Sequence, residues 1–110
     1  MQDELLHDAN EVSVSDEAAL VMKAKSDDSA FELLYNKYLP KIYGYVMKRV
    51  GDHAEAEDIV SQTFMKVASK LPEFEIKKDG TFKSCLYRIA TNMMIDYFRK
   101  FGLRKTDSID

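Results

Sequence analysis

Apolar side chains recur every three or four residues along most of the chain, which is the period of one buried face of an α-helix. The longest such pattern begins after Asp28, a residue type favoured at helix N-caps, and continues to about Val50. Pro40 lies inside the pattern and predicts a bend or a break near Tyr38. The apolar positions of this helix are Phe31, Leu34, Tyr35, Tyr38, Ile42, Tyr45, Val46 and Val50.

A second long helix is predicted between Gly51 and Pro72. Glycine commonly follows the end of a helix, and Asp52 with Glu55 three residues later has the spacing of a capping box. Proline cannot continue the hydrogen-bond ladder, so Pro72 should stop this helix. Its expected apolar stripe consists of Ala56, Ile59, Val60, Phe64, Val67, Ala68 and Leu71.

The last helix is predicted from about Phe82 to Phe101, after a polar loop from Glu73 to Thr81. At 100° per residue, the arc that should face the core comprises Phe82, Cys85, Leu86, Ile89, Ala90, Met93 and Tyr97. A shorter helix is expected from Ser15 to about Ser26, with an inner side formed by Leu20, Val21 and Ala24. The sequence therefore predicts an all-α domain over residues 15–102, a small bundle of three long helices plus a short N-terminal helix.

The composition agrees with helices joined by short connections and excludes several protein classes. Four glycines and two prolines among 110 residues are too few for the many turns of a β-sandwich or barrel. No apolar run approaches the ~20 residues of a membrane span, and the first twenty residues are acidic, unlike a secretion signal. Cys85 is the only cysteine, so no internal disulfide can form, and a reducing cytoplasm is the expected location.

Charge is distributed unevenly along the chain. Residues 1–32 carry nine acidic and two basic side chains, a local charge of −7. The first 14 residues have no periodic pattern of apolar positions and are predicted to be a mobile tail. Residues 81–105 carry six basic side chains and one acidic, a local charge of +5. The C-terminal part should therefore attract a polyanion such as DNA, although the net charge of the chain is −3. Two unrelated solvated surfaces would produce the same asymmetry.

The sequence has no residues at the spacing of a catalytic or metal site. His7 and His53 are far apart, and neither has cysteine or carboxylate neighbours at the spacing of metal ligands. Glu55, Glu57 and Asp58 lie at a predicted helix N-terminus, where the helix dipole favours negative charge without any function. A glycine-rich phosphate loop is absent, as is a nucleophile beside a base. We therefore expect no enzyme activity, no cofactor and no metal ion.

The outward side of the last helix suits nucleic acid. An exposed ridge is predicted at spacings of four, three and four, formed by Arg88, Asn92, Ile95 and Arg99. Arginine and asparagine donors suit phosphates and base edges. The flank beside this ridge mixes cations with aromatic and thioether groups, and it consists of Lys83, Tyr87, Thr91, Met94 and Phe98. Unpaired bases stack on such rings, but the flank would also suit packing against the chain itself or against a protein partner.

Three segments of the chain resemble one protein family. The stretch Phe82-Lys-Ser-Cys-Leu-Tyr-Arg-Ile-Ala-Thr-Asn, followed by Ile95-Asp96-Tyr97 and Arg99, resembles the minus-ten-reading helix of bacterial sigma-70 family sigma factors, extracytoplasmic-function type. Ala56-Glu57-Asp58-Ile59-Val60 with Phe64 resembles the polymerase-binding helix of that family, and Phe31-x-x-Leu-Tyr-x-x-Tyr resembles its first helix. Together they cover roughly Ser29 to Lys100 and imply region 2, which binds RNA polymerase core and melts the promoter minus-ten element.

The resemblance implies three functional surfaces. One contacts promoter DNA on the non-template strand, through Lys83, Tyr87, Arg88, Thr91, Asn92, Asp96, Arg99 and Lys100. The second is a loop that holds a base flipped from the melted strand, formed by Phe74, Lys77, Lys78, Asp79, Gly80, Thr81 and Phe82. The third binds the clamp coiled coil on the largest subunit of RNA polymerase core, through Asp58, Ser61, Gln62 and Met65. An anti-sigma factor that covers these surfaces is a further partner compatible with the resemblance.

The chain departs from the family pattern in two places. Cys85 stands where the family usually has a tryptophan before Leu-Tyr-Arg, which removes a broad ring from the expected melting edge. Ser61 and Gln62 stand where the family tends to have glutamine and an acidic residue, which removes a charge from the polymerase contact. Members of the family also have a second domain, which reads the minus-thirty-five element, and we expect residues 103–110 to begin a linker to such a domain.

Two other functions fit parts of the pattern. A helical protein-interaction module without DNA binding would use the same outer flank. A helix-turn-helix repressor would insert a helix into the major groove, but the predicted loop after Leu71 is too long for its turn. Binding that weakens steeply with salt would distinguish a DNA-binding domain from a protein adaptor.

Overall fold

The computed structural model describes residues 14–101, and all regular structure in this range is helical. Its elements in chain order are α2 (Val14–Ala24), α3 (Asp28–Val50), α4 (His53–Lys70), the 3-10 turn η1 (Leu71–Glu73), α5 (Ile76–Asp79) and α6 (Phe82–Phe101). The predicted bundle of three long helices and a short N-terminal helix is therefore confirmed. Val14 already belongs to α2, and the rest of the predicted tail lies outside the described residues, as does the predicted linker.

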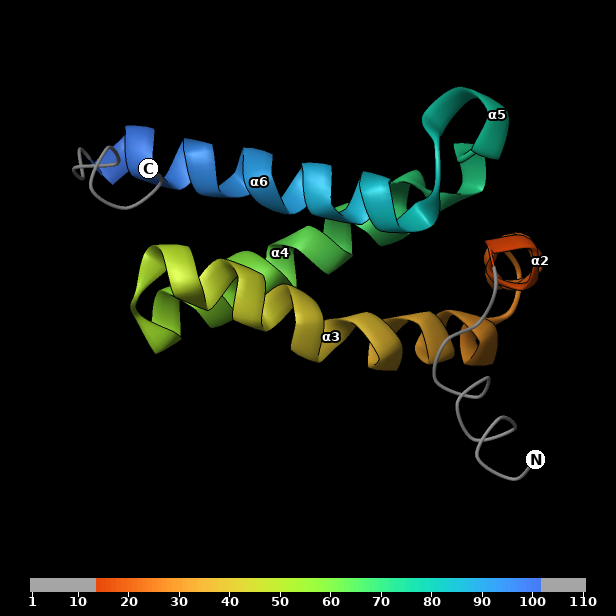
Figure 1. Ribbon diagram of the computed structural model, residues 1–110, viewed down its shortest axis with the longest axis horizontal. Helices are drawn as coiled ribbons and strands as arrows, with labels where there is room; N and C mark the ends of the chain where they lie inside the picture. The colour runs from red at the N-terminus through yellow and green to blue at the C-terminus, as the bar shows by residue number, and fades with distance from the viewer. Residues whose placement is uncertain (1–13, 102–110) are drawn as a thin grey trace.

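The three long helices form the body of the fold (Figure 1). α3 and α6 run in the same direction, and α4 runs back between them and packs against both. α2 lies across the first turns of α3, near the end where α6 begins. Because α6 contacts α3 as well as α4, two of its sides are covered. None of the helices described between residues 14 and 101 is long and apolar enough to cross a membrane.

Asp27, and not Asp28, is the N-cap of α3. Its carboxylate accepts hydrogen bonds from the hydroxyl of Ser29 at 2.7 Å and from the backbone N–H of Ser29 at 2.9 Å. These bonds favour the charged form and lower the pKa of the Asp27 carboxyl group. Asp28 is the first helical residue, where its charge lies at the positive end of the helix dipole. The predicted cap is therefore one residue too late.

Pro40 was predicted to bend or break the helix near Tyr38, and a break is excluded because α3 is continuous through Pro40. Proline has no N–H to donate to the carbonyl one turn earlier, so the helix loses one hydrogen bond at this point. Side chains buried before and after Pro40 compensate for the loss of this hydrogen bond. The buried residues of α3 share one face and are Ala30, Leu34, Tyr38, Ile42 and Val46. Packing of this face against the core keeps the two halves in one helix.

Both ends of α4 agree with the sequence prediction. Gly51 ends α3 in the left-handed region, at φ 77°, and its N–H donates to the Met47 carbonyl at 2.8 Å. The Asp52 carboxylate accepts from the backbone N–H of Glu55 at 2.9 Å, which is one half of the predicted capping box. α4 ends at Lys70, and Pro72 lies in the turn η1 that follows.

The buried stripe of α4 differs from the prediction at two positions. Ala68 is exposed, whereas Thr63 is fully buried. The Thr63 hydroxyl donates to the carbonyl of Ile59 at 2.7 Å, so this buried polar group has a partner within its own helix. The other predicted positions are buried, namely Ala56, Ile59, Val60, Phe64, Val67 and Leu71.

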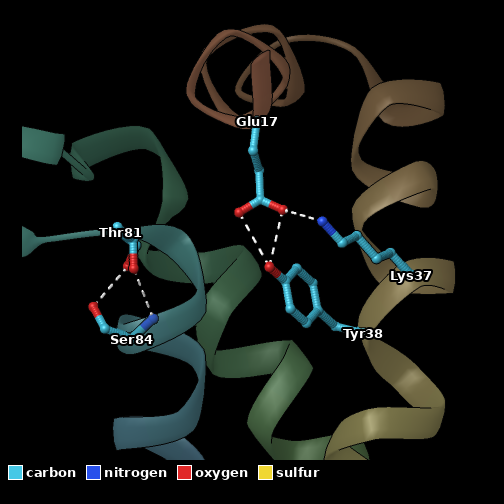
Figure 2. A network of polar contacts seen from close by, with 5 residues as sticks. All are labelled: Glu17, Lys37, Tyr38, Thr81 and Ser84. Carbon is cyan, nitrogen blue, oxygen red and sulfur yellow. Dashed lines mark hydrogen bonds and ion pairs between the residues drawn. The ribbon is translucent and has the colours of Figure 1, made fainter. Parts of the chain in front are cut away.

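The inner side of α2 is as predicted, with Val21 and Ala24 buried and Leu20 partly buried against the core. A polar contact also attaches α2 to α3 (Figure 2). The Glu17 carboxylate points from α2 toward α3, where it accepts from the Tyr38 hydroxyl at 2.9 Å and from the Lys37 ammonium at 2.8 Å. Burial and the Glu17 hydrogen bond raise the pKa of Tyr38 far above its ordinary value, so its hydroxyl remains a donor.

The segment between α4 and α6 has more regular structure than the polar loop predicted from Glu73 to Thr81. It contains the end of η1 and the four-residue helix α5. Phe74, between these two elements, is only 5% exposed. The ammonium of Lys25, just after α2, donates to the Phe74 carbonyl at 2.6 Å. One apolar side chain and one distant lysine therefore fix this connection to the bundle.

The first turn of α6 depends on Gly80. Its φ of 86° lies in the left-handed region, and a Cβ there would come within 3.0 Å of the Ser84 hydroxyl oxygen. The next residue, Thr81, accepts from the backbone N–H of Ser84 at 3.1 Å through its hydroxyl, as Figure 2 shows. Glycine therefore permits the turn, and threonine caps the helix that follows.

The buried arc of α6 is broader than the predicted one. Five residues of the first half are buried as predicted, namely Phe82, Cys85, Leu86, Ile89 and Ala90. In the second half, Met94 (2% exposed) and Phe98 (1% exposed) are buried, whereas Met93 and Tyr97 are only partly buried. The cause is the contact with α3, which covers a second side of the helix. The placement of Met94 and Phe98 on an exposed flank was therefore wrong.

Candidate nucleic-acid interface

The predicted ridge of α6 is exposed. Arg88 and Asn92 lie one turn apart on the surface, and Ile95 is 37% exposed beside them. Lys83 and Lys100 are exposed near the two ends of the helix. Donors that suit phosphates and base edges are therefore accessible along the length of α6.

Arg99 and Asp96 form an ion pair at the C-terminal end of this ridge. Arg99 Nη1 donates to Asp96 Oδ1 at 3.1 Å, and the two side chains are 71% and 70% exposed. Water screens a pair this exposed, so it contributes little to stability. A phosphate can therefore replace Asp96 as the partner of Arg99 at small cost.

The flank beside the ridge belongs to the interface between α3 and α6. The Tyr45 hydroxyl and the Thr91 hydroxyl share a hydrogen bond of 2.8 Å. The rings of Tyr45 and Tyr87 meet edge to face, with centroids 4.9 Å apart. Tyr87 and Thr91 keep partial exposure, while Met94 and Phe98 are buried. The flank is therefore mostly packing within the chain, which was one of the alternatives left open by the sequence.

A cleft of about 540 Å³ lies between α6, the end of α4 and the segment that joins them. α6 contributes Cys85, Arg88, Ile89, Asn92, Met93 and Asp96. The joining segment contributes Glu73, Phe74, Lys78 and Asp79, and α4 contributes Lys66 and Lys70. The cleft thus brings together residues predicted to read DNA and residues predicted to hold a flipped base. Lys66 and Lys70 were missed by the sequence analysis, because only the fold brings the end of α4 next to α6.

The rim of the cleft is charged and its floor is not. Four cations line it, namely Lys66, Lys70, Lys78 and Arg88, against three carboxylates, Glu73, Asp79 and Asp96. Within residues 14–101 none of the four cations is in an ion pair. Asp79 is partly satisfied, since it accepts from the backbone N–H of Glu75 at 2.8 Å. A ligand with an apolar ring and an anionic group would match this arrangement.

Cys85 lies on the cleft floor as a neutral thiol. It is 8% exposed, and burial raises the pKa of the thiol although the nearby Arg88 opposes that change. Because the thiolate is the nucleophile, we expect Cys85 to react with a disulfide reagent at pH 7.5 at least ~tenfold more slowly than free cysteine. Because burial favours the protonated thiol, the stability that this preference gives the fold is present below the ordinary pKa of a thiol. It is lost as the pH rises through the raised pKa of Cys85. Reaction as fast as that of free cysteine would instead mean that the floor is open to solvent.

The other residues of the predicted base-holding loop differ in accessibility. Lys77, Gly80 and Thr81 are exposed. Phe82 is 3% exposed and packs against the Tyr38 ring, with centroids 5.6 Å apart. Phe74 is also in the core. Phe74 therefore lines the cleft and Phe82 packs in the core, and neither ring extends into solvent.

The four residues predicted to bind polymerase lie together on the outer side of α4. Asp58, Ser61, Gln62 and Met65 are all exposed, and Met65 is 68% exposed. The Gln62 amide donates to Asp58 Oδ2 at 2.7 Å, which holds the carboxylate in place. Beside them is a groove of about 430 Å³ between α3 and α4, lined by Tyr35, Leu39, Pro40, Tyr43, Glu57, Val60 and Ser61. A carboxylate next to an apolar groove suits a protein partner with a basic group.

Comparison with known proteins gives a consistent result. A family model described as Sigma-70 region 2 matches residues 34–103. The ECF RNA polymerase sigma factor SigW of Bacillus subtilis is 38% identical over 76 residues, which are 69% of this chain and 40% of that protein. The RNA polymerase sigma-H factor of Pseudomonas aeruginosa is 37% identical over 84 residues, 76% of this chain and 42% of that protein. The chain therefore spans about two fifths of the length of these relatives. No solved structure matches the chain.

Proposed function

The chain belongs to the sigma-70 region 2 family, within the extracytoplasmic-function group, and on that premise we propose that it binds RNA polymerase core and recognises and melts the promoter minus-ten element. The observation that carries the proposal is the cleft, which joins the donors of α6 to the segment after α4. The protein acts by binding and not by catalysis, in the cytoplasm, where the polymerase is.

The cleft has the features needed to hold one unpaired base of the non-template strand. Arg88 and Asn92 stand on its α6 wall, where they can donate to base edges. Phe74, Cys85 and Ile89 give it an apolar floor. Extruding a base from a duplex costs a few kcal/mol, which contacts to the base must return. A floor without a tryptophan ring offers less stacking, so we expect polymerase to supply part of the melting energy.

The phosphates of the same strand are held by the surrounding cations. Arg99 and Lys100 continue the α6 surface beyond the cleft, and Lys83 lies at the other end. Lys66 and Lys70 face α6 across the cleft. Phosphate contacts fix the position of a strand without reading its sequence. We therefore assign sequence recognition to Arg88 and Asn92, and strand alignment to the outer cations.

The outer side of α4 is the proposed docking surface for the clamp coiled coil on the largest polymerase subunit. This surface faces away from the core, with Asp58 oriented by Gln62 and Met65 exposed beside it. An anti-sigma factor covering either surface is a compatible regulator. The adaptor alternative used the outer flank of α6, but Met94 and Phe98 of that flank are buried and unavailable to a partner.

Single alanine substitutions should separate base reading from backbone attraction. We expect Arg88→Ala and Asn92→Ala each to weaken binding to a single-stranded minus-ten oligonucleotide by about 1–3 kcal/mol, with the loss depending on the sequence. Arg99→Ala and Lys100→Ala should weaken every sequence alike. Fluorescence anisotropy against a set of single-stranded oligonucleotides at fixed salt measures both effects. Equal losses for all four variants on every sequence would leave only electrostatic attraction and exclude base reading by the ridge.

A further inference from the structure

Arg49, in the last turn of α3, is held in a fixed position by Tyr45. The guanidinium carbon of Arg49 lies 4.0 Å from the centroid of the Tyr45 ring, and Arg49 Nη1 donates to the Tyr45 carbonyl at 2.9 Å. Tyr45 is itself attached to α6 through the hydroxyl of Thr91 and the ring of Tyr87. The guanidinium therefore has a defined place relative to α6, although it belongs to another helix.

Most of the hydrogen-bonding capacity of Arg49 is unused. A guanidinium has five N–H donors, and the contact with the Tyr45 carbonyl uses one. Within residues 14–101 Arg49 has no carboxylate partner, and its side chain is partly exposed. An arginine stacked on a ring keeps the edges of its plane free, and such an edge can bind a phosphate through two parallel hydrogen bonds.

The contact with Thr91 places this guanidinium beside the proposed DNA surface. Thr91 is three residues after Arg88 and four before Ile95, so the three are neighbours on the face of α6. At 100° per residue, Thr91, Arg88, Asn92 and Asp96 follow one another around the helix. The last three line the cleft, and Thr91 does not. The ridge therefore has the cleft along one edge and the Tyr45–Arg49 pair along the other.

We propose that Arg49 binds a phosphate of the single DNA strand whose base occupies the cleft, so that the DNA-binding surface continues from α6 onto α3. This inference rests on the proposed function, since it assumes that a strand lies along the ridge. The ligand is a phosphodiester group, held by the edge of the guanidinium while Tyr45 supports its face. Arg49 therefore aligns the strand and does not read its sequence.

Arg49→Gln tests the proposal, with Lys41→Gln as a matched control. Lys41 is an exposed cation on the same helix, but it does not line the cleft and takes no part in the contact between Arg49 and Tyr45. Both substitutions remove one positive charge. Anisotropy titrations with a mixed-sequence single-stranded oligonucleotide should show binding about fivefold weaker for Arg49→Gln, and a salt slope smaller by ~0.7. Lys41→Gln should stay within twofold of the unchanged protein. A scan with oligonucleotides that carry one neutral methylphosphonate linkage should find a position that weakens the unchanged protein but not Arg49→Gln.

The outcomes separate this proposal from the one on which it rests. Equal affinities for Arg49→Gln and Lys41→Gln, with Arg88→Ala still impaired, would overturn the role of Arg49 and leave the ridge intact. Absence of single-strand binding by the unchanged protein, with or without polymerase core, would overturn both proposals. Thermal melting accompanies each titration, because Arg49 also bonds to the last turn of α3. If Arg49→Gln unfolds, Arg49→Lys takes its place: it keeps the charge and should retain the salt slope while losing affinity, and unchanged affinity counts against the proposal.

Discussion

Phe98→Ala is expected to destabilise the fold by about 3–5 kcal/mol, the usual cost of truncating a buried phenylalanine. Phe98 is 1% exposed and is among the largest fully buried side chains of the described residues. Its ring also meets the Tyr97 ring, with centroids 5.3 Å apart. Truncation would leave a cavity where α6 packs against the bundle, because a close-packed core fills such a space only partly. Urea denaturation followed by circular dichroism gives the change in unfolding free energy.

Ile95→Ala is the control for Phe98→Ala on the same helix. Ile95 is 37% exposed, so its truncation should cost less than ~1 kcal/mol. Had Phe98 been part of an exposed stacking flank, its removal would weaken single-strand binding and leave stability nearly unchanged. Suppose instead that Phe98→Ala unfolds at the same urea concentration as the unchanged protein but binds DNA more weakly. That result would support an exposed stacking flank and contradict the packing of α6 described above.

Helix positions and most helix ends could be predicted from the sequence, because the signals are local. Gly51 and Asp52 determine the turn between α3 and α4 through their own backbone and side-chain bonds. Pro72 lies just beyond the end of α4, as expected. The sequence could not decide between a bend and a break at Pro40, because that choice depends on whether packing on both sides outweighs one lost hydrogen bond, and that balance is a property of the whole core.

The second side of α6 could not be predicted from its own sequence. A helical wheel locates one apolar stripe, and the stripe through Cys85 and Ile89 was found correctly. A second stripe, through Met94 and Phe98, is also apolar, but apolar side chains beside cations equally suit a stacking surface. The contact between Tyr45 and Thr91 decides between these alternatives, and those residues are 46 positions apart in the chain. Long-range packing of this kind leaves no local signal.

The residues of the candidate site also fall into those that the sequence could predict and those that it could not. Arg88 and Asn92 could be found from spacing and from the family resemblance, since both lie on one exposed ridge of one helix. Lys66 and Lys70 could not, because an exposed lysine near a helix end is ordinary until the fold places it across a cleft from α6. In the sequence Arg49 is likewise an ordinary cation, and only the fold shows that its guanidinium stacks on the Tyr45 ring. Sites made from several helices require the fold.

Asp58→Arg is expected to weaken binding to purified RNA polymerase core by about 2–4 kcal/mol, which is at least ~30-fold in Kd. Asp58 is exposed, and its carboxylate is held by the Gln62 amide at 2.7 Å. The groove beside it is lined mainly by apolar and aromatic side chains, so a partner docked there would exclude water from the carboxylate. An ion pair shielded from water is far stronger than an exposed one, and an arginine at this position would face a basic group with the same charge.

The control for this charge reversal is Glu75→Arg. Glu75 is an exposed acidic residue next to α5 and lines neither the cleft nor the groove, so the same change of two charges should alter core binding less than twofold. Arg88→Ala should likewise leave core binding unchanged while it impairs DNA binding, because Arg88 is on α6 and not on the outer side of α4. Both charge-reversal variants should keep the helical circular dichroism signal and the melting temperature. Unchanged core binding by a folded Asp58→Arg protein would exclude the outer side of α4 as the polymerase contact, whereas equal losses for Asp58→Arg and Glu75→Arg would reduce that contact to a general effect of net charge.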